Sequence, residues 1–193
     1  MKNIYNIITT FIVIVTFFTV LNAKNIPLKT IQLCGSNGGY AKGGTWKSNS
    51  LLGKTNVLIY TDPDEFSELK QFVSDIENEK MKNNSFDLTL IVNTEATMLP
   101  TFVIRSKIKS KAKVSKTINY VLDNDKVLVD EWNLQDDSIN ILVLDSLNQV
   151  QYQQSGEVNP SQLKQIMRII HKSVLQQGDL IPLSDKSVQQ KIK

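Results

Sequence analysis

The sequence predicts an α/β protein with a mixed central sheet and helices on both faces. Short apolar runs rich in β-forming residues, at 57–61, 86–93 and 117–123, alternate with segments whose apolar residues recur every three or four positions. A short helical segment, two strand-like segments joined by a turn, and one more amphipathic helix follow the third run. Strands separated by helices favour parallel pairing and strands joined by a turn are antiparallel, so the sheet is mixed.

The composition is that of one globular domain. A chain of 193 residues can bury a sizeable core but is short for two domains. Apolar residues make up 41% and charged residues 21%, which excludes disorder throughout. The 22 basic and 19 acidic residues nearly cancel, so no nucleic-acid partner is expected.

Residues 1–23 are predicted to be a secretory signal peptide. Lys2 precedes an uncharged run at 7–21, and a small residue, Ala23, follows it. The run is shorter than the about 20 apolar residues of a typical transmembrane span. Leu21 is larger than the residue usually found three places before a cleavage site, so an uncleaved membrane anchor is the alternative. The mature domain is expected at 24–177, followed by a polar tail at 178–193.

Cys34 is the single cysteine, so no internal disulfide can form. It ends an alternating segment, LKTIQLC at 28–34, and this pattern favours a buried cysteine on a strand. The alternatives are a reactive thiol and an intermolecular disulfide. Residues 35–44 hold five of the eight glycines and predict a flexible turn or hairpin tip. They lack the lysine and helix of a phosphate-binding loop, so no nucleotide is expected.

The strand at 57–61 leads into a segment with a clear helix start. Asp62 is predicted to be the N-cap, Pro63 the first helical residue and Glu65 the third, an acid that can satisfy free backbone N–H groups. The apolar stripe expected to face the sheet consists of Phe66, Leu69, Val73 and Ile76.

The segment 101–116 fits two patterns. Lysines at 107, 109, 111 and 113 alternate as in a strand, whereas Ile104, Ile108 and Ala112 recur at every fourth position, as in a helix. We predict a helix, followed by a strand at 117–123 and a short helix and loop. The basic side chains then form a solvated helix face, with contact to an anionic membrane or partner as the alternative.

The C-terminal elements have the clearest signals. Asn148 suits a turn position with positive φ between two strands. The last helix has Asn159 as its predicted cap, Pro160 first, Gln162 third and Gly178 at its end. Its apolar stripe consists of Leu163, Ile166, Met167, Ile170 and Val174.

This element order resembles a thioredoxin-like three-layer sandwich of the redoxin type. Three blocks of sequence carry a closer resemblance: GTWKSNSLLGKTNVL (44–58), LTLIVNT (88–94) followed by FVIRS (102–106), and INILVLDSLNQVQYQQSGEVNPSQLKQIM (139–167). Together they resemble the YtfJ-type family of bacterial periplasmic proteins. Asn148 stands where a redoxin hairpin usually has glycine. The resemblance implies a small periplasmic protein whose biochemical activity is not established.

Thioredoxin-type catalysis needs a thiolate at the N-terminus of the first long helix. Here that helix starts with Asp62, Pro63, Asp64 and Glu65, without a cysteine. These acids occupy the positive end of the helix dipole and would repel a thiolate. Disulfide exchange is therefore not expected.

The resemblance places the loop at 134–139 beside this helix start, where a redoxin has a cis-proline and this chain has none. Asp136 and Asp137 could then face Asp62, Asp64 and Glu65, and together attract a basic peptide or bind Ca²⁺. The alternative is that these acids are caps and solvated loop residues that do not converge. His171 has no second histidine, so a metal or triad role is not expected.

The favoured hypothesis is a non-enzymatic exported protein, without cofactor or metal, that binds another exported protein or a peptide through this surface. The rival hypothesis is a thiol-dependent peroxidase or redox protein that uses Cys34. A third is a scaffold tethered to the membrane by residues 1–23.

Overall fold

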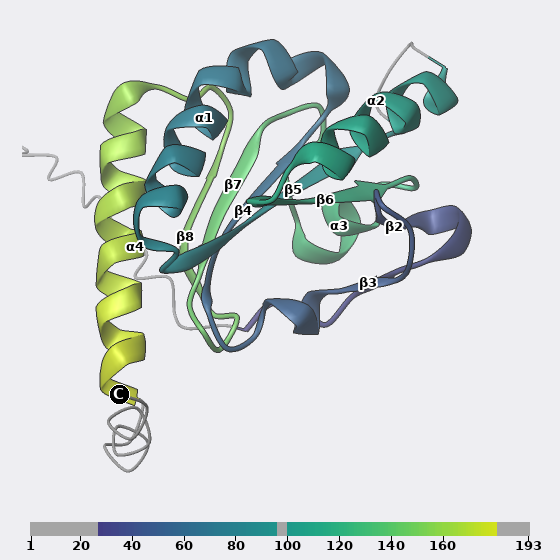
Figure 1. The fold of residues 1–193 in the computed structure, drawn as a ribbon. Helices are drawn as coiled ribbons and strands as arrows, with labels where there is room; N and C mark the ends of the chain where they lie inside the picture. Colours follow the sequence, from purple (N-terminus) through teal and green to yellow (C-terminus); the bar gives the residue numbers. More distant parts are fainter. Residues whose placement is uncertain (1–26, 96–99, 181–193) are drawn as a thin grey trace, which may run out of the picture.

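The computed structural model describes residues 27–95 and 100–180, which form an α/β fold around a six-stranded sheet (Figure 1). The strand order is β2-β6-β5-β4-β7-β8. The strands are Gly38–Tyr40 (β2), Thr55–Thr61 (β4), Phe86–Asn93 (β5), Ile118–Asp123 (β6), Asn140–Leu144 (β7) and Val150–Ser155 (β8). The three central strands β4, β5 and β6 pair in parallel. The other pairs are antiparallel: β2 with β6, β7 with β4, and β8 with β7. The predicted mixed sheet is confirmed.

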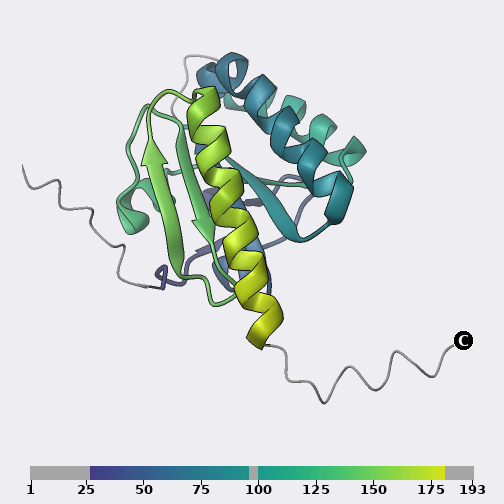
Figure 2. The ribbon, with the colours of Figure 1, turned by 90° about the vertical axis from the view of Figure 1, so that its left-hand side faces the viewer.

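Helices cover both faces of the sheet, as Figures 1 and 2 show. α1 (Phe66–Asn83), α2 (Thr101–Val114) and α4 (Pro160–Leu180) pack on one face. α3 (Val127–Trp132) packs on the other face, together with a two-stranded ladder. The ladder consists of Gln32–Leu33 (β1) and Trp46–Lys47 (β3). The chain also forms three short 3-10 helices in the described ranges, Gly35–Asn37 (η1), Ser48–Leu51 (η2) and Pro63–Glu65 (η3).

The alternation of side chains along the strands separates the two halves of the core. On β4, Val57 and Ile59 pack with α1 and α4, whereas Leu58 and Tyr60 pack with α3 and the ladder. All residues of β4 are buried, as expected for a central strand with both faces covered. The predicted stripe of α1 is correct, with Leu69 and Ile76 fully buried.

Strand β2 lies where the sequence indicates only a flexible turn. Gly38 and Gly39 pair with Asp123 and Leu122 of β6 at the edge of the sheet. Both have φ of 130°, and a Cβ atom on Gly38 would lie 2.0 Å from the carbonyl oxygen of Leu122. Only glycine allows this close approach, so these residues form a strand because they lack side chains.

Helix α2 confirms the helical interpretation of 101–116. Ile104, Ile108 and Ala112 are buried, and Arg105 and the neighbouring lysines of the basic run are exposed. The β7–β8 hairpin is also as predicted, with Asn148 at φ of 58°. The predicted end of the last helix is wrong, because α4 continues through Gly178 to Leu180.

The N-terminal cap of α4 is confirmed in atomic detail. The Asn159 Oδ1 atom accepts hydrogen bonds from the backbone N–H groups of Ser161 and Gln162, at 3.0 and 3.2 Å. The Gln162 Oε1 atom in turn accepts the Asn159 N–H at 2.6 Å. This reciprocal pair is a capping box.

Replacing this cap should destabilise the protein measurably. Asn159→Ala leaves two backbone N–H groups of α4 without their acceptor and should lower the free energy of unfolding by about 1 kcal/mol. Urea unfolding of the variant and its parent measures the difference. Asn78→Ala, on the exposed side of α1, is the control and should not lower stability. An equal loss in both variants would contradict a capping role for Asn159.

Within the described ranges, no helix is long and apolar enough to cross a membrane. The predicted signal peptide at 1–23 and residues 181–193 of the predicted tail lie outside the described residues.

Candidate functional site

The candidate site lies at the carboxyl edge of the sheet, which we define as the ends of β4, β5 and β6 together with the loop at 135–138 before β7. The three parallel strands end side by side here, the place where open α/β sheets carry their ligand sites. Side chains alternate between the two faces of a sheet, and those at every second position of these strands point to the face that α3 covers. Four polar residues occupy such positions at or just after the strand ends: Tyr60, Asp62, Asn93 and Asp123. Strand alternation therefore brings polar groups of three strands toward one another.

Asp62 follows β4 and is the central acid of this edge. It stands at the N-cap position of η3, which leads into α1, but its side chain accepts no capping hydrogen bond. The predicted side-chain cap is therefore wrong, because the carboxyl group turns into the protein and is only 5% exposed. Its Oδ1 atom is buried and has no hydrogen-bond partner among the described residues.

The surroundings of Asp62 favour its neutral form. The pKa of this carboxyl is raised to about 6, mainly by burial and also by the charges of Asp137 and Asp136. The Asn93 amide and the Ser138 N–H are close enough to oppose this shift. The Asn93 Nδ2 atom nevertheless reaches no acceptor of the described residues with hydrogen-bond geometry. Within this part of the chain, the carboxyl edge thus holds a buried acceptor and a buried donor that are both unpaired.

A second buried acid, Asp123, organises the same edge. Its carboxylate accepts the backbone N–H groups of Val127 and Leu128 at 3.0 and 2.9 Å, which fixes the start of α3. The Tyr60 hydroxyl donates to it at 3.3 Å. Burial raises the pKa of Asp123, and burial beside Asp123 and Asp62 raises the pKa of Tyr60. This pair is not among the residues predicted from the sequence, although an acid that ends a buried strand just before a helix is a detectable signal.

The loop at 135–138 is held in place by Asn140, which is fully buried at the start of β7. Its Oδ1 atom accepts the Gln135 N–H at 2.9 Å and the Ser155 hydroxyl at 2.6 Å. Its Nδ2 atom donates to the Gln135 carbonyl at 2.8 Å. These bonds fix the position of Asp136 and Asp137 relative to Asp62.

Asp136 is not a free acid, because Lys126 pairs with it at 2.8 Å. The hydrogen bond from Lys126 holds the pKa of Asp136 below its ordinary value. Lys126 and Asp137 have φ of 44° and 46°, a region that residues other than glycine seldom occupy. Lys126 was not recognised in the sequence, since its pairing depends on a backbone conformation that no pattern indicates.

The five predicted acids converge only in part. Asp136 and Asp137 lie near enough to be among the main causes of the raised pKa of Asp62, whereas Asp64 and Glu65 are not. Asp64 is exposed and Glu65 half-buried, both within η3. Across residues 27–95 and 100–180, no group of three His, Cys, Asp or Glu side chains is placed to hold a metal ion. The calcium hypothesis therefore has no ligand set in the described structure.

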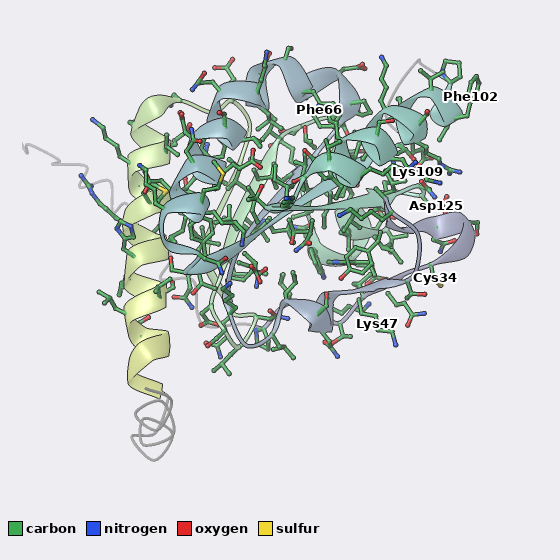
Figure 3. The ribbon with its side chains drawn as sticks, viewed as in Figure 1. Cys34, Lys47, Phe66, Phe102, Lys109 and Asp125 are labelled. Atoms are coloured by element: carbon green, nitrogen blue, oxygen red, sulfur yellow. The ribbon has the colours of Figure 1, made fainter. Side chains whose placement is uncertain are left out.

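Cys34 is exposed, so the prediction of a buried cysteine is wrong. It directly follows β1 and leads into η1, and its sulfur accepts a hydrogen bond from the Gln32 side chain at 3.5 Å. Figure 3 shows it beside the glycine-rich segment, apart from Phe66 at the start of α1. The thiol thus does not occupy the place at which a thioredoxin holds its reactive cysteine. His171 is exposed on α4.

The exposure of Cys34 leads to a direct prediction. In the folded protein, a maleimide reagent should label this thiol at a rate close to that of the urea-unfolded chain, because no unfolding step is needed. Mass spectrometry of timed samples measures the rate. Cys34→Ser should take no label, and strong protection of the native thiol would contradict the exposed position.

The fold defines the class of this protein: it is an α/β protein with a thioredoxin-like fold. One similar structure is a putative thiol:disulfide interchange protein DsbE from Chlorobium tepidum, with a TM-score of 0.55 and 12% identity, covering 78% of this chain and 96% of that one. Another is StoA from Bacillus subtilis, with a TM-score of 0.53 and 18% identity, covering 74% of this chain and 98% of that one. At these identities the likeness shows the fold alone.

The chain belongs to the family described as "Bacterial protein of unknown function (YtfJ_HI0045)", whose model matches residues 31–173. It is also similar to the uncharacterized protein YtfJ of Escherichia coli (strain K12). The two are 27% identical over 131 residues, which cover 66% of this chain and 71% of the relative. The predicted family and fold are therefore confirmed, and the matched relatives assign no reaction.

Proposed function

We propose that this protein is a periplasmic binding or accessory protein that recognises a basic segment of another exported protein or peptide at the carboxyl edge, without disulfide exchange. The predicted signal peptide at 1–23 supports export. The segment that leads into α1 holds Asp62 and the two acids of η3 in place of a cysteine, which supports a function independent of thiol chemistry.

The unpaired Oδ1 atom of Asp62 is the observation that carries this proposal. A buried acceptor without a partner is unfavourable, and a donor from a ligand would remove that cost. Asp137 adds negative charge beside it, and Asp136, although paired with Lys126, also acts on this carboxyl. A lysine or arginine side chain supplies both the donor and the opposite charge.

Entry of such a cation would also favour the ionised form of Asp62. An opposite charge in contact lowers a carboxyl pKa, so the cation would reverse part of the effect of burial. Binding should therefore release a proton near pH 6 and should weaken as the pH falls below 6. It should also weaken with added salt, since the attraction is between charges.

Site-specific crosslinking tests this proposal. A photoreactive residue in place of Asp137 samples the carboxyl edge, and one in place of Lys172, exposed on α4, is the matched control. Irradiation in cells should give a product at Asp137 that is absent at Lys172, and mass spectrometry should locate the bond in a basic segment. A peptide of that segment should bind the purified protein and lose affinity in Asp62→Asn. Identical products at both positions, or unchanged affinity in Asp62→Asn, would refute the proposal.

One observation favours a second candidate, a thiol-dependent peroxidase or redox protein that uses Cys34. The exposed sulfur meets the requirement of access. Its hydrogen bond comes from an amide, and no lysine, arginine or histidine of the described residues pairs with it to stabilise a thiolate. Peroxide consumption by the purified protein, abolished in Cys34→Ser, would establish this function; equal rates in both proteins would exclude it.

A further inference from the structure

The opposite end of the sheet carries a hollow that the proposed function does not use. It has a volume of about 430 Å³ and lies at the amino edge, where α1 ends and β5 and β6 begin. Three lysines line it: Lys54 before β4, Lys80 in the last turn of α1, and Lys116 before β6. They meet there because β4, β5 and β6 are parallel and start side by side.

A single carboxylate pairs with two of these lysines. The Nζ atom of Lys80 donates to Oδ1 of Asp87 at 2.7 Å, and Lys54 donates to the same oxygen at 3.2 Å. Burial alone would raise the pKa of Asp87, but the two lysines outweigh it and hold the pKa below its ordinary value. Among the described residues, Asp87 is the one acid that lines the hollow, so its charge leaves two of the three positive charges there uncompensated.

Lysines and side-chain amides supply hydrogen-bond donors to the hollow. Lys80 is only 7% exposed, and it uses two of its three N–H groups, on Asp87 and on the carbonyl oxygen of Phe86. Lys116 forms no ion pair or hydrogen bond with any described residue. The side-chain amides of Asn84 and Asn119 also line the hollow and also have no partner within the described ranges.

We propose that this hollow binds a phosphate ester. Its donors converge from α1, from the turn after α1 and from β6, and a tetrahedral group with several anionic oxygens can accept from all of them at once. The hollow is large enough to hold a phosphate group together with part of the molecule that carries it. The phosphate can belong to a soluble ester or to a lipid headgroup, because both present the same oxygens.

Titration with inorganic phosphate tests the site itself. Amide chemical shifts of the full-length protein should change first at residues 84, 116 and 119, and chloride at equal ionic strength should not reproduce the change. Lys116→Gln should weaken phosphate binding about tenfold, since it removes one charged donor. The fold should tolerate this change because Lys116 is exposed and unpaired.

Two further variants make the test specific. Lys82→Gln is the matched control, because Lys82 is exposed close to the hollow, pairs with Glu79 and does not line the hollow. It should leave the affinity unchanged. Asp87→Asn removes the competing carboxylate and should tighten binding several-fold. Equal weakening in Lys82→Gln and Lys116→Gln, or phosphate binding no stronger than chloride binding, would overturn the proposal.

The source of the phosphate is decided by comparing ligands. If the ligand is a soluble ester, glycerol phosphate should bind with a dependence on Lys116. If the ligand is a lipid headgroup, vesicles of phosphatidylglycerol should bind the parent protein more tightly than Lys116→Gln. Vesicles of phosphatidylcholine should bind neither protein. The proposal fails if neither ligand class distinguishes Lys116→Gln from its parent.

Discussion

Asp62→Asn should raise the free energy of unfolding at pH 7.5 by about 1–3 kcal/mol. The folded protein raises the pKa of Asp62 from 3.8 to about 6, which corresponds to at most about 3 kcal/mol. The folded state thus binds this proton more tightly than the unfolded chain does. Stability falls as the pH rises from about 4 to about 6, and above pH 6 the protein carries the full cost of the buried charge. Asparagine keeps the shape and removes the charge.

Urea unfolding of the variant and its parent at pH 4, 6 and 7.5 measures this effect. The advantage of the variant should be greatest at pH 7.5 and small at pH 4, where Asp62 is protonated in the folded protein. Asp64→Asn, an exposed acid two residues further along, is the control and should leave stability nearly unchanged. An advantage of Asp62→Asn that does not depend on pH would show that the buried charge is not its cause.

Asn140→Ala should lower the free energy of unfolding by about 2–4 kcal/mol, because it removes the hydrogen bonds of a fully buried side chain and leaves its part-buried partners unsatisfied. The Gln135 N–H and carbonyl and the Ser155 hydroxyl all lose a hydrogen bond. The loop at 135–138 should also lose its fixed position. Amide hydrogen exchange at 135–138 should therefore accelerate more than exchange in the centre of β5.

Asn119→Ala is the matched control for this change. Asn119 is also on a strand of the sheet, in β6, but its side chain is exposed. Its replacement should change stability by less than about 0.5 kcal/mol. If Asn140→Ala and Asn119→Ala were equally stable, the hydrogen bonds of Asn140 would not be what holds the loop.

Elements whose signals are local could be predicted from the sequence. The cap of α4 depends on Asn159 and Gln162, which are three residues apart, and both hydrogen bonds formed as expected. The prediction of a helix for 101–116 was correct because the buried side chains are Ile104, Ile108 and Ala112, which recur at helical spacing. The alternating lysines are exposed, and the spacing of exposed side chains does not determine the secondary structure.

Features that depend on distant parts of the chain could not be predicted. β2 exists because Gly38 and Gly39 fit against β6, about 80 residues later, and glycine gives no hydrophobic pattern. Asp62 fitted a cap by position, but tertiary burial turned its carboxyl group inward. Cys34 followed an alternating pattern that ends with β1 at Leu33, one residue before the cysteine.

The parallel arrangement of β4, β5 and β6 has an electrostatic consequence for the whole molecule. Lys54, Lys82 and Lys116 precede these strands, whereas Asp62, Glu95 and Asp125 follow them. These six residues thus place positive charge before the parallel strands and negative charge after them, although the net charge of the chain is only +3. In a field from a charged surface the molecule should turn before it makes contact, and salt that shortens the Debye length to below about 10 Å should abolish this orientation.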